Sequence, residues 1–212
     1  LSIRRQRQMC IRDSHKAVDK VNLHIKKGAI YGFIGRNGAG KTTCLKMISG
    51  LARPTAGEIE MFGCKGKELE RIRSRVGCLI EAPGLYGNMN AYTNLKIKCE
   101  LFGIRKKGYI EDILETVGLE GVGKKKTKHF SLGMKQRLGI GLALVGEPDL
   151  LVLDEPINGL DPQGIAEVRD TIQRLRDERN MTILISSHIL EELSKIATAY
   201  GCLLYTSDAA DE

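Results

Sequence analysis

A glycine-rich octapeptide in the first quarter of the chain constrains the fold more than any other feature. It follows a short apolar run at 29–34, typical of a buried strand, and precedes an apolar-periodic stretch at 43–49 that predicts a helix beginning at Lys41. Its spacing, G-x-x-x-x-G-K-[ST], is that of a loop whose backbone N–H groups converge on phosphate oxygens. We therefore predict a strand, a phosphate-binding loop and a helix, with ligand contacts from Gly35, Arg36, Asn37, Gly38, Ala39, Gly40, Lys41, Thr42 and Thr43.

Each residue type in this loop suits a nucleotide. Glycine lets the backbone approach phosphates where a side chain would collide, and the start of the helix adds partial positive charge. Lys41 supplies a full positive charge, and the hydroxyl of Thr42 can ligate Mg²⁺. The alternative is a glycine-rich turn that binds nothing, which the motifs downstream disfavour.

A second motif lies at 150–156, where a continuous apolar run ends in Asp154 and Glu155. Such a run predicts a buried parallel strand with two carboxylates at its C-terminal end, the edge where open α/β sheets bind ligands. Asp154 suits Mg²⁺, directly or through water. Glu155 suits a general base that accepts the proton of an attacking water. The alternative is a pair of solvated carboxylates, which the phosphate loop makes less favoured.

The segment at 130–137, FSLGMKQR, separates this chain from other phosphate-loop proteins. It resembles the L-S-G-G-Q signature of the ATP-binding cassettes of ABC transporters. Ser131 and Gly133 match the serine and the second glycine, whereas Leu132 and Met134 replace the first glycine and the glutamine. The resemblance implies ATP as the nucleotide, and a head-to-tail dimer in which Ser131 and Gly133 of one cassette bind the γ-phosphate held by the other.

Further positions match the cassette pattern. Residues 158–161 resemble its D-loop, with Asp161 predicted to cap a helix that has Pro162 in its first turn. His188 resembles the switch histidine that contacts the γ-phosphate; a histidine with only a structural role at a helix start is the alternative. Glu81 stands where cassettes carry a glutamine that reaches Mg²⁺ and the attacking water, and a carboxylate can also ligate Mg²⁺.

Glu81 and the altered signature together resemble the bacitracin-resistance and lantibiotic-protection group of exporters; the alternative is variation within a generic transporter ATPase. The resemblance implies a Mg²⁺-dependent ATPase subunit that powers export of a substrate, for example a peptide antibiotic, through a separate transmembrane permease. It would be cytoplasmic and peripheral on the inner face of the cell membrane, with an identical second subunit.

Two other functions stay open at this point. One is a non-transport ABC ATPase, an ATP-switched clamp or a translation factor, against which the lack of a coiled-coil insertion between Gly35 and Ser131 argues. The other is a binding module that closes on ATP without turnover, against which Glu155 argues.

Hydrophobic periodicity predicts an α/β fold: a P-loop NTPase core with a mixed sheet and an inserted helical signature subdomain, truncated at both ends. The core is expected at 15–83 and 146–201, and the subdomain at 84–145. Strands are expected at 29–34, 59–63, 76–80, 150–153 and 182–185. Helices of the subdomain are expected at 92–102, at 110–117 and after the signature.

Both ends of the chain need a different explanation, since neither resembles the cassette. Residues 1–14 and 202–212 resemble translated adapter DNA of a sequencing library. Back-translation of 4–14 yields a transposon-end sequence, and back-translation of 202–212 yields its reverse complement. We therefore expect both segments to be non-native and 15–201 to be cut from a longer gene.

Composition excludes several classes of function. Cys44, Cys64, Cys78 and Cys99 form no C-x-x-C pair, which favours reduced thiols over disulfides or zinc. The net charge is +7, but the run at 124–126 has no interleaved aromatic residue and the chain has no tryptophan, so this run predicts a solvated loop and not a nucleic-acid site. No apolar run approaches the ~18 residues of a membrane span, so we expect the transport pathway on another chain.

Overall fold

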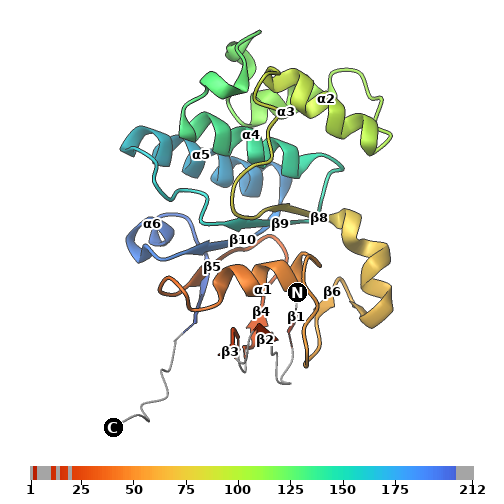
Figure 1. Ribbon diagram of the computed structural model, residues 1–212, viewed down its shortest axis with the longest axis vertical. Helices are drawn as coiled ribbons and strands as arrows, with labels where there is room; N and C mark the ends of the chain where they lie inside the picture. The colour runs from red at the N-terminus through yellow and green to blue at the C-terminus, as the bar shows by residue number, and fades with distance from the viewer. Residues whose placement is uncertain (1, 4–10, 13–14, 19–20, 204–212) are drawn as a thin grey trace.

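A parallel five-stranded sheet forms the centre of the molecule, in a computed structural model that describes residues 2–3, 11–12, 15–18 and 21–203 (Figure 1). Every pairing in this sheet is parallel. Its strand order is β11 (Ala199–Cys202), β5 (Ile30–Ile34), β10 (Thr182–Ser187), β9 (Leu150–Asp154) and β8 (Val76–Leu79). The carboxyl ends of all five strands therefore lie along one edge.

The apolar runs form strands because both faces of this sheet are covered. All five residues of β9 are buried. Leu151 and Leu153 belong to one hydrophobic core, while Leu150 and Val152 belong to the other. Because successive side chains of a strand point to opposite faces, an uninterrupted apolar sequence is what a sheet between two helical layers requires.

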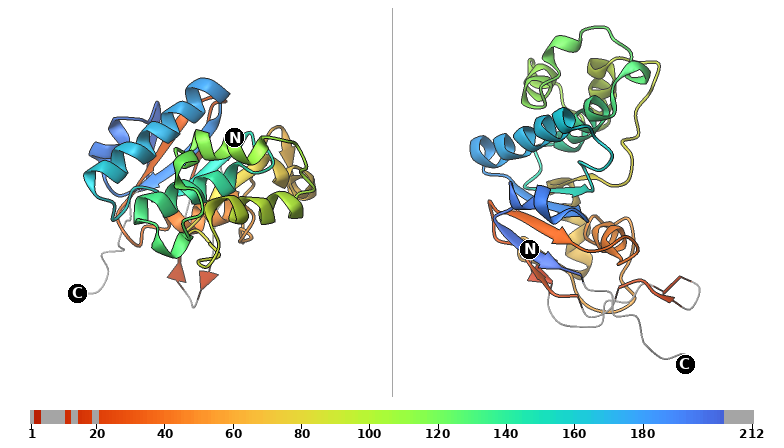
Figure 2. Two further views of the ribbon diagram at one scale, coloured as in Figure 1. Left: turned by 90° about the horizontal axis from the view of Figure 1, so that it is seen from above. Right: turned by 90° about the vertical axis from the view of Figure 1, so that its left-hand side faces the viewer.

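Helices cover the two faces unequally (Figures 1 and 2). One face carries α1 (Lys41–Ile48). The other carries α4 (Leu132–Leu144) and α5 (Pro162–Arg179), with α2 (Ala91–Leu101) and α3 (Tyr109–Thr116) packed beyond them. The remaining described helices are η1 (Gly66–Arg75), η2 (Glu120–Val122), η3 (Thr127–His129) and α6 (Leu190–Ser194).

Among the described strands, antiparallel pairing occurs in two separate sheets. One has the order β4 (Leu23–His24), β1 (Ser2–Ile3), β6 (Glu60–Met61) and β7 (Cys64–Lys65), and the other pairs β2 (Ile11–Arg12) with β3 (His15–Lys16). The core thus contains both strand directions, as expected, but in different sheets. The strand expected at 59–63 is shorter, because Phe62 and Gly63 adopt positive φ and turn the chain into β7.

The sequence-based expectations agree with the remaining elements to within two residues at most boundaries. The structure adds α6 and β11, which the sequence did not predict. Within the segments that resemble adapter DNA, only 2–3, 11–12 and 202–203 are described, so most of that prediction lies outside the described residues. None of the described helices combines the length and the apolar character needed to cross a membrane.

Candidate nucleotide-binding site

The phosphate loop joins the end of β5 to α1, as its sequence predicts. Gly38 and Gly40 have φ values of 83° and 91°, a left-handed conformation that favours glycine. Gly40 is the N-cap of α1 and has no side chain with which to occupy the first N–H groups of the helix. A Cβ at Gly40 would lie 2.2 Å from the carbonyl oxygen of Ala17. The loop therefore presents the N-terminus of α1, which suits an anion.

Lys41 turns its side chain back across this loop. Its Nζ donates to the carbonyl oxygens of Gly35 and Arg36 at 2.7 and 3.1 Å, and it lies 3.2 Å from Oε1 of Glu155. Only 4% of the Lys41 side chain is exposed. A cation held by two carbonyls and one carboxylate has a fixed position within the loop.

Thr42 and Asp154 meet at the same edge of the sheet. The Thr42 hydroxyl donates to Oδ2 of Asp154 at 2.7 Å, and the Ser186 hydroxyl donates to Oδ1 of Asp154 at 2.5 Å. Ser186 is fully buried and lies beside Asp154 in the register of β10 and β9. No motif in the sequence marks Ser186; its only local signal is its place two residues before His188 at the end of an apolar strand.

Glu155 lies between the lysine and the histidine that the sequence singled out. Its Oε2 is 3.0 Å from Nδ1 of His188, while its Oε1 faces Lys41. Its backbone N–H donates to Oγ of Ser186 at 2.9 Å, and its φ is 46°, a strained value for a residue with a side chain. The fold therefore holds this carboxylate by both its backbone and its side chain.

Residues from three separate parts of the sequence thus form one polar cluster, namely Lys41, Thr42, Asp154, Glu155, Ser186 and His188. They meet because β5, β10 and β9 are neighbours whose carboxyl ends are level: Ser187 is in register with Ile34, and Ser186 with Asp154. This is the edge where parallel α/β sheets bind ligands.

The residues present fit a nucleotide with Mg²⁺. A hydroxyl and a carboxylate that face each other are the oxygen ligands that Mg²⁺ takes when phosphates complete its coordination. Across the described part of the chain, no group of three or more His, Cys, Asp or Glu side chains forms a metal site of its own.

Glu81 is placed differently from the cluster residues. It follows β8 with φ at 63°, and its Oε1 lies 2.5 Å from Nζ of Lys46. Two thirds of its side chain is exposed. Lys46 lies one turn beyond Thr42 on α1, so Glu81 is tied to the helix that follows the phosphate loop, and no described contact joins it to Asp154 or Glu155.

The signature residues lie on the other face of the sheet from α1 (Figure 1). Ser131 is the N-cap of α4, and its hydroxyl accepts from the N–H of Met134 at 3.2 Å. Gly133 packs against Gly164 of α5, where an added Cβ would lie 3.3 Å from the Gly164 Cα. Asp161 caps α5 by accepting from the Gly164 N–H at 3.2 Å, which confirms the predicted cap.

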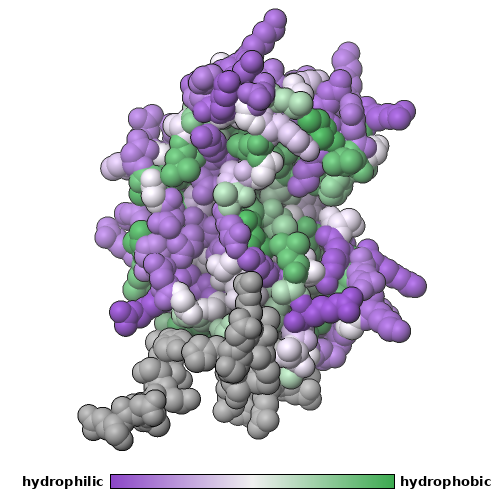
Figure 3. All heavy atoms as spheres, in the orientation of Figure 1, coloured by the Kyte–Doolittle hydropathy of each residue, from purple (hydrophilic) through white to green (hydrophobic). Residues whose placement is uncertain are grey.

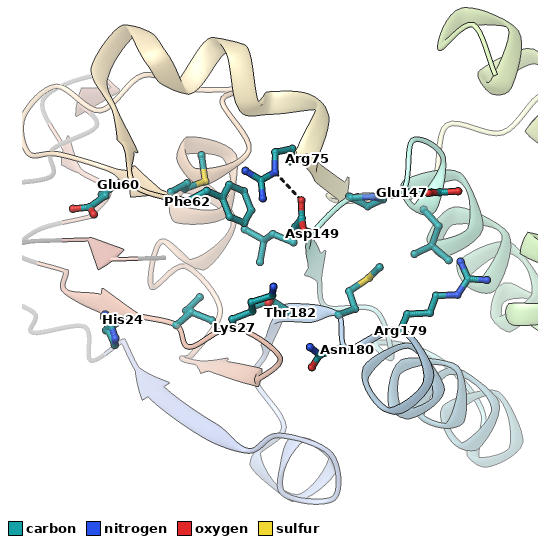
Figure 4. A pocket seen from close by; sticks show the side chains of 17 residues that line it. His24, Lys27, Glu60, Phe62, Arg75, Glu147, Asp149, Arg179, Asn180 and Thr182 are labelled. Atoms are coloured by element: carbon teal, nitrogen blue, oxygen red, sulfur yellow. Dashed lines mark hydrogen bonds and ion pairs between the residues drawn. The ribbon is translucent and has the colours of Figure 1, made fainter.

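A cavity of about 680 Å³ lies at the opposite edge of the sheet, where β9 and β10 begin (Figure 4). Arg75 spans its wall, pairing with Asp149 at 2.7 Å and stacking over the ring of Phe62. None of the predicted site residues lines this cavity. The candidate site is therefore defined by the polar cluster and not by this cavity.

Comparison with known proteins identifies the family of the chain. The protein-family model described as ABC transporter matches residues 18–158 of this chain. The bacitracin transport ATP-binding protein BcrA of Bacillus licheniformis is 52% identical over 191 residues, which make up 90% of this chain and 62% of BcrA. The lantibiotic transport ATP-binding protein SrtF of Streptococcus pyogenes is 46% identical over 185 residues, 87% of this chain and 79% of SrtF. The chain thus spans less than two thirds of the length of BcrA.

A solved structure shares the fold. A dimeric ATP-binding cassette in a post-hydrolysis state, bound to ADP and phosphate, superposes with a TM-score of 0.81 at 23% identity, covering 95% of this chain and 93% of that one. The family match includes both the phosphate loop and the carboxylate pair. The chain therefore belongs to the ABC transporter family, as an ATP-binding cassette.

Proposed function

We propose that this chain is the ATP-hydrolysing subunit of an ABC exporter. The observation that carries the proposal is the position of Glu155, whose two carboxylate oxygens face Lys41 and His188 beside the pair formed by Thr42 and Asp154. A carboxylate held in this way is suited to accept the proton of a water that attacks the γ-phosphate. General base catalysis of this kind contributes about 10²- to 10⁴-fold in rate.

The other residues of the cluster would bind and orient the nucleotide. The backbone N–H groups of residues 35–43 and the Nζ of Lys41 would hold the phosphates, and Thr42 and Asp154 would hold Mg²⁺. When bound, Mg²⁺ would neutralise charge on the phosphates. His188 would contact the γ-phosphate from the far side of Glu155, and Glu81 would reach the metal and the water after leaving Lys46.

We infer that two copies work as a head-to-tail dimer. Within one chain, Ser131 and Gly133 lie at the start of α4, on the opposite face of the sheet from α1. A γ-phosphate on the loop of one copy could then be reached by Ser131 and Gly133 only from the second copy. The dimeric state of the solved cassette with ADP and phosphate supports this arrangement.

We also propose a surface for the permease. An apolar groove, with a volume of about 380 Å³, lies beside the edge strand β8, between the segment after Glu81 and α2. Leu51, Leu101 and Phe102 line it while 64%, 80% and 49% exposed, and hydrophobic residues gather on the side of the molecule that carries α2 (Figure 3). Exposed apolar patches of this kind favour protein contacts. Docking of the permease here would move the segment that contains Glu81. Because Glu81 pairs with Lys46 of α1, this movement would also reach α1.

The exported substrate is proposed to be a peptide antibiotic, because BcrA and SrtF carry bacitracin and lantibiotic transport in their names. The protein would then work on the cytoplasmic face of the membrane, attached through the permease. The test is to express the full-length gene with its neighbouring permease gene in a bacitracin- and lantibiotic-sensitive host. We expect increased resistance, abolished by Glu155→Gln; ATP hydrolysis without export of any such peptide would instead favour a clamp or a translation factor.

The groove has its own test. Leu101→Glu places a charge on an exposed side chain far from the polar cluster, so ATP hydrolysis by the isolated subunit should stay within about twofold of wild type. Co-purification with the permease should be lost. A variant that still co-purifies would show that the permease docks elsewhere.

A further inference from the structure

The connection between α3 and α4 lies against the segment that leads into α2. Asn90 and Lys126 form an antiparallel bridge, and the N–H of Lys128 donates to the carbonyl oxygen of Gly87 at 2.9 Å. Buried Thr127 fastens the contact: its N–H donates to Met89 O at 2.9 Å and its hydroxyl to the carbonyl oxygen of Tyr86 at 3.0 Å. Two segments 41 residues apart in sequence therefore form one fixed surface.

Four lysines project from this surface. Lys124, Lys125, Lys126 and Lys128 are all exposed, and none of them forms an ion pair with a described carboxylate. By contrast, Lys46, Lys65 and Lys195 each pair with a glutamate. Figure 3 shows hydrophilic side chains projecting over this upper end of the molecule.

Acidic residues are scarce around these four lysines. The stretches 82–99 and 121–146, which form the two sides of the surface, contain no Asp and no Glu. They carry instead Lys98 and Lys135 in addition to the four lysines, whereas Lys96 pairs with Glu100 and Arg137 pairs with Glu167, both outside these stretches. The potential over this end of the molecule is therefore positive, which attracts anions over about the Debye length of ~10 Å.

Exposed tyrosine and methionine side chains occur in the segment to which the lysine connection is fastened and in the first turn of α2. Tyr86 and Met89 lie in that segment and are 55% and 38% exposed, and Tyr92, near the start of α2, is 41% exposed. Tyrosine has an apolar ring and a polar end, and is enriched where protein meets the headgroups of a membrane. Tyr86 also lines the apolar groove beside β8, so the lysine surface and the groove are continuous.

We propose that this lysine surface, formed by Lys124, Lys125, Lys126 and Lys128 with Tyr86, Met89 and Tyr92, binds anionic lipid headgroups of the membrane next to the permease. The inference rests on the proposed function, which brings the adjoining groove to a membrane protein. Clustered lysines at a membrane surface recognise anionic lipids, while the tyrosines and Met89 enter the headgroup region. Lipid contact would orient the groove toward the permease before the two proteins dock.

The test measures co-sedimentation of the full-length protein with lipid vesicles and uses no permease. Vesicles of phosphatidylcholine mixed with phosphatidylglycerol should bind the protein, and vesicles of phosphatidylcholine alone should bind it far less. Each lysine near an anionic surface contributes about fivefold to binding, so Lys124→Gln, Lys125→Gln and Lys126→Gln together should weaken it on the order of 100-fold. Added salt should weaken the wild type in the same direction.

A matched variant removes the same charge from elsewhere. Lys26→Gln, Lys27→Gln and Lys67→Gln change three exposed lysines near the opposite edge of the sheet and on η1, and should lower binding by no more than about threefold. Thermal melting and ATP binding, unchanged in both triple variants, exclude misfolding as the cause.

Three results would overturn the proposal: equal binding to both kinds of vesicle, equal losses from the two triple variants, or binding of RNA in place of vesicles that is lost in the Lys124–Lys126 variant. Failure of the proposed transport function is distinguishable. It would appear as missing ATP hydrolysis or missing export in the assays above, whereas vesicle binding requires neither a permease nor turnover.

Discussion

Ser186 should prove to be the residue that positions both carboxylates of the site. Its buried hydroxyl donates to Asp154 and accepts from the backbone N–H of Glu155. Ser186→Ala removes both hydrogen bonds and leaves a buried carboxylate oxygen of Asp154 and the partly buried N–H of Glu155 without this partner. A hydrogen bond to a charged group contributes about 1.5–3 kcal/mol and an ordinary one about 0.5–1.5 kcal/mol. We therefore expect the free energy of unfolding to fall by about 2–4 kcal/mol.

The same change should slow catalysis more than it weakens nucleotide binding. The left-handed backbone of Glu155, with φ at 46°, costs about 1–3 kcal/mol and persists only because its surroundings impose it. Without the Ser186 hydroxyl, Glu155 can relax away from the attacking water, and a loss of about 1.4–2.8 kcal/mol in the transition state lowers kcat by about 10- to 100-fold. ATP affinity measured without Mg²⁺ should stay within about threefold, because the phosphate loop is untouched.

Urea unfolding and steady-state ATP hydrolysis on the full-length protein measure the two effects. Ser187→Ala is the matched control: it makes the same change at the next buried residue, whose hydroxyl accepts from the N–H of Ile189 at 2.9 Å and touches neither carboxylate. It should lower stability by about 1 kcal/mol and leave kcat nearly unchanged. If Ser186→Ala hydrolyses ATP within twofold of wild type, or if Ser187→Ala loses as much activity, the positioning role is refuted.

Three further predictions follow from the site and its surroundings. Glu155→Gln keeps the shape of the side chain and removes its basicity, so turnover should fall by about 10²-fold or more while ATP binding is retained. Turnover within a few-fold of wild type in this variant would remove Glu155 as the base. Lys41→Ala should instead weaken ATP binding itself. Glu81→Gln should keep substantial ATPase activity and Glu81→Ala should not, and normal hydrolysis and export by the alanine variant would make Glu81 a bystander. Burial raises the pKa of the Cys44 thiol from 9.0 to about 12, so at about pH 8 a thiol reagent should modify exposed Cys202 and spare Cys44 in the native protein. The Cys44 thiol loses its proton at a lower pH in the unfolded chain than in the folded chain, so the free energy of unfolding should fall as the pH rises from 9.0 toward about 12. Cys44→Ala should make that fall shallower. Identical slopes in the variant and the wild type would contradict the burial of this thiol.

The chemically specific parts of the site could be predicted from the sequence because they depend on local spacing. The loop at 35–42 must place glycines, a lysine and a hydroxyl within one turn of a helix start, and Asp154 and Glu155 must directly follow an apolar strand. The positions of the central strands could also be predicted from the sequence, since a strand buried on both faces needs a continuous apolar run. The cap formed by Asp161 followed from one residue and the proline after it.

Other features had no local signal, and only the tertiary structure decided them. Strand β11 alternates half-buried and exposed residues at the sheet edge, so no apolar run marks it. The short strand β6 ends at Phe62 because that residue adopts a left-handed conformation, which no pattern in its neighbourhood predicts. The pairing of Glu81 with Lys46 joins residues 35 positions apart.

The sequence by itself determined which side chains are available for chemistry, and the tertiary structure decided which of them meet. Ser186 became part of the site because β10 lies between β5 and β9, an order that the order along the chain does not reveal. In the same way, no aromatic residue is interleaved with the lysines at 124–126 in the sequence, yet Thr127 fastens their connection to the segment that carries Tyr86. Local spacing constrains groups within a few residues, whereas contacts between distant segments depend on the packing of the whole sheet and its helices.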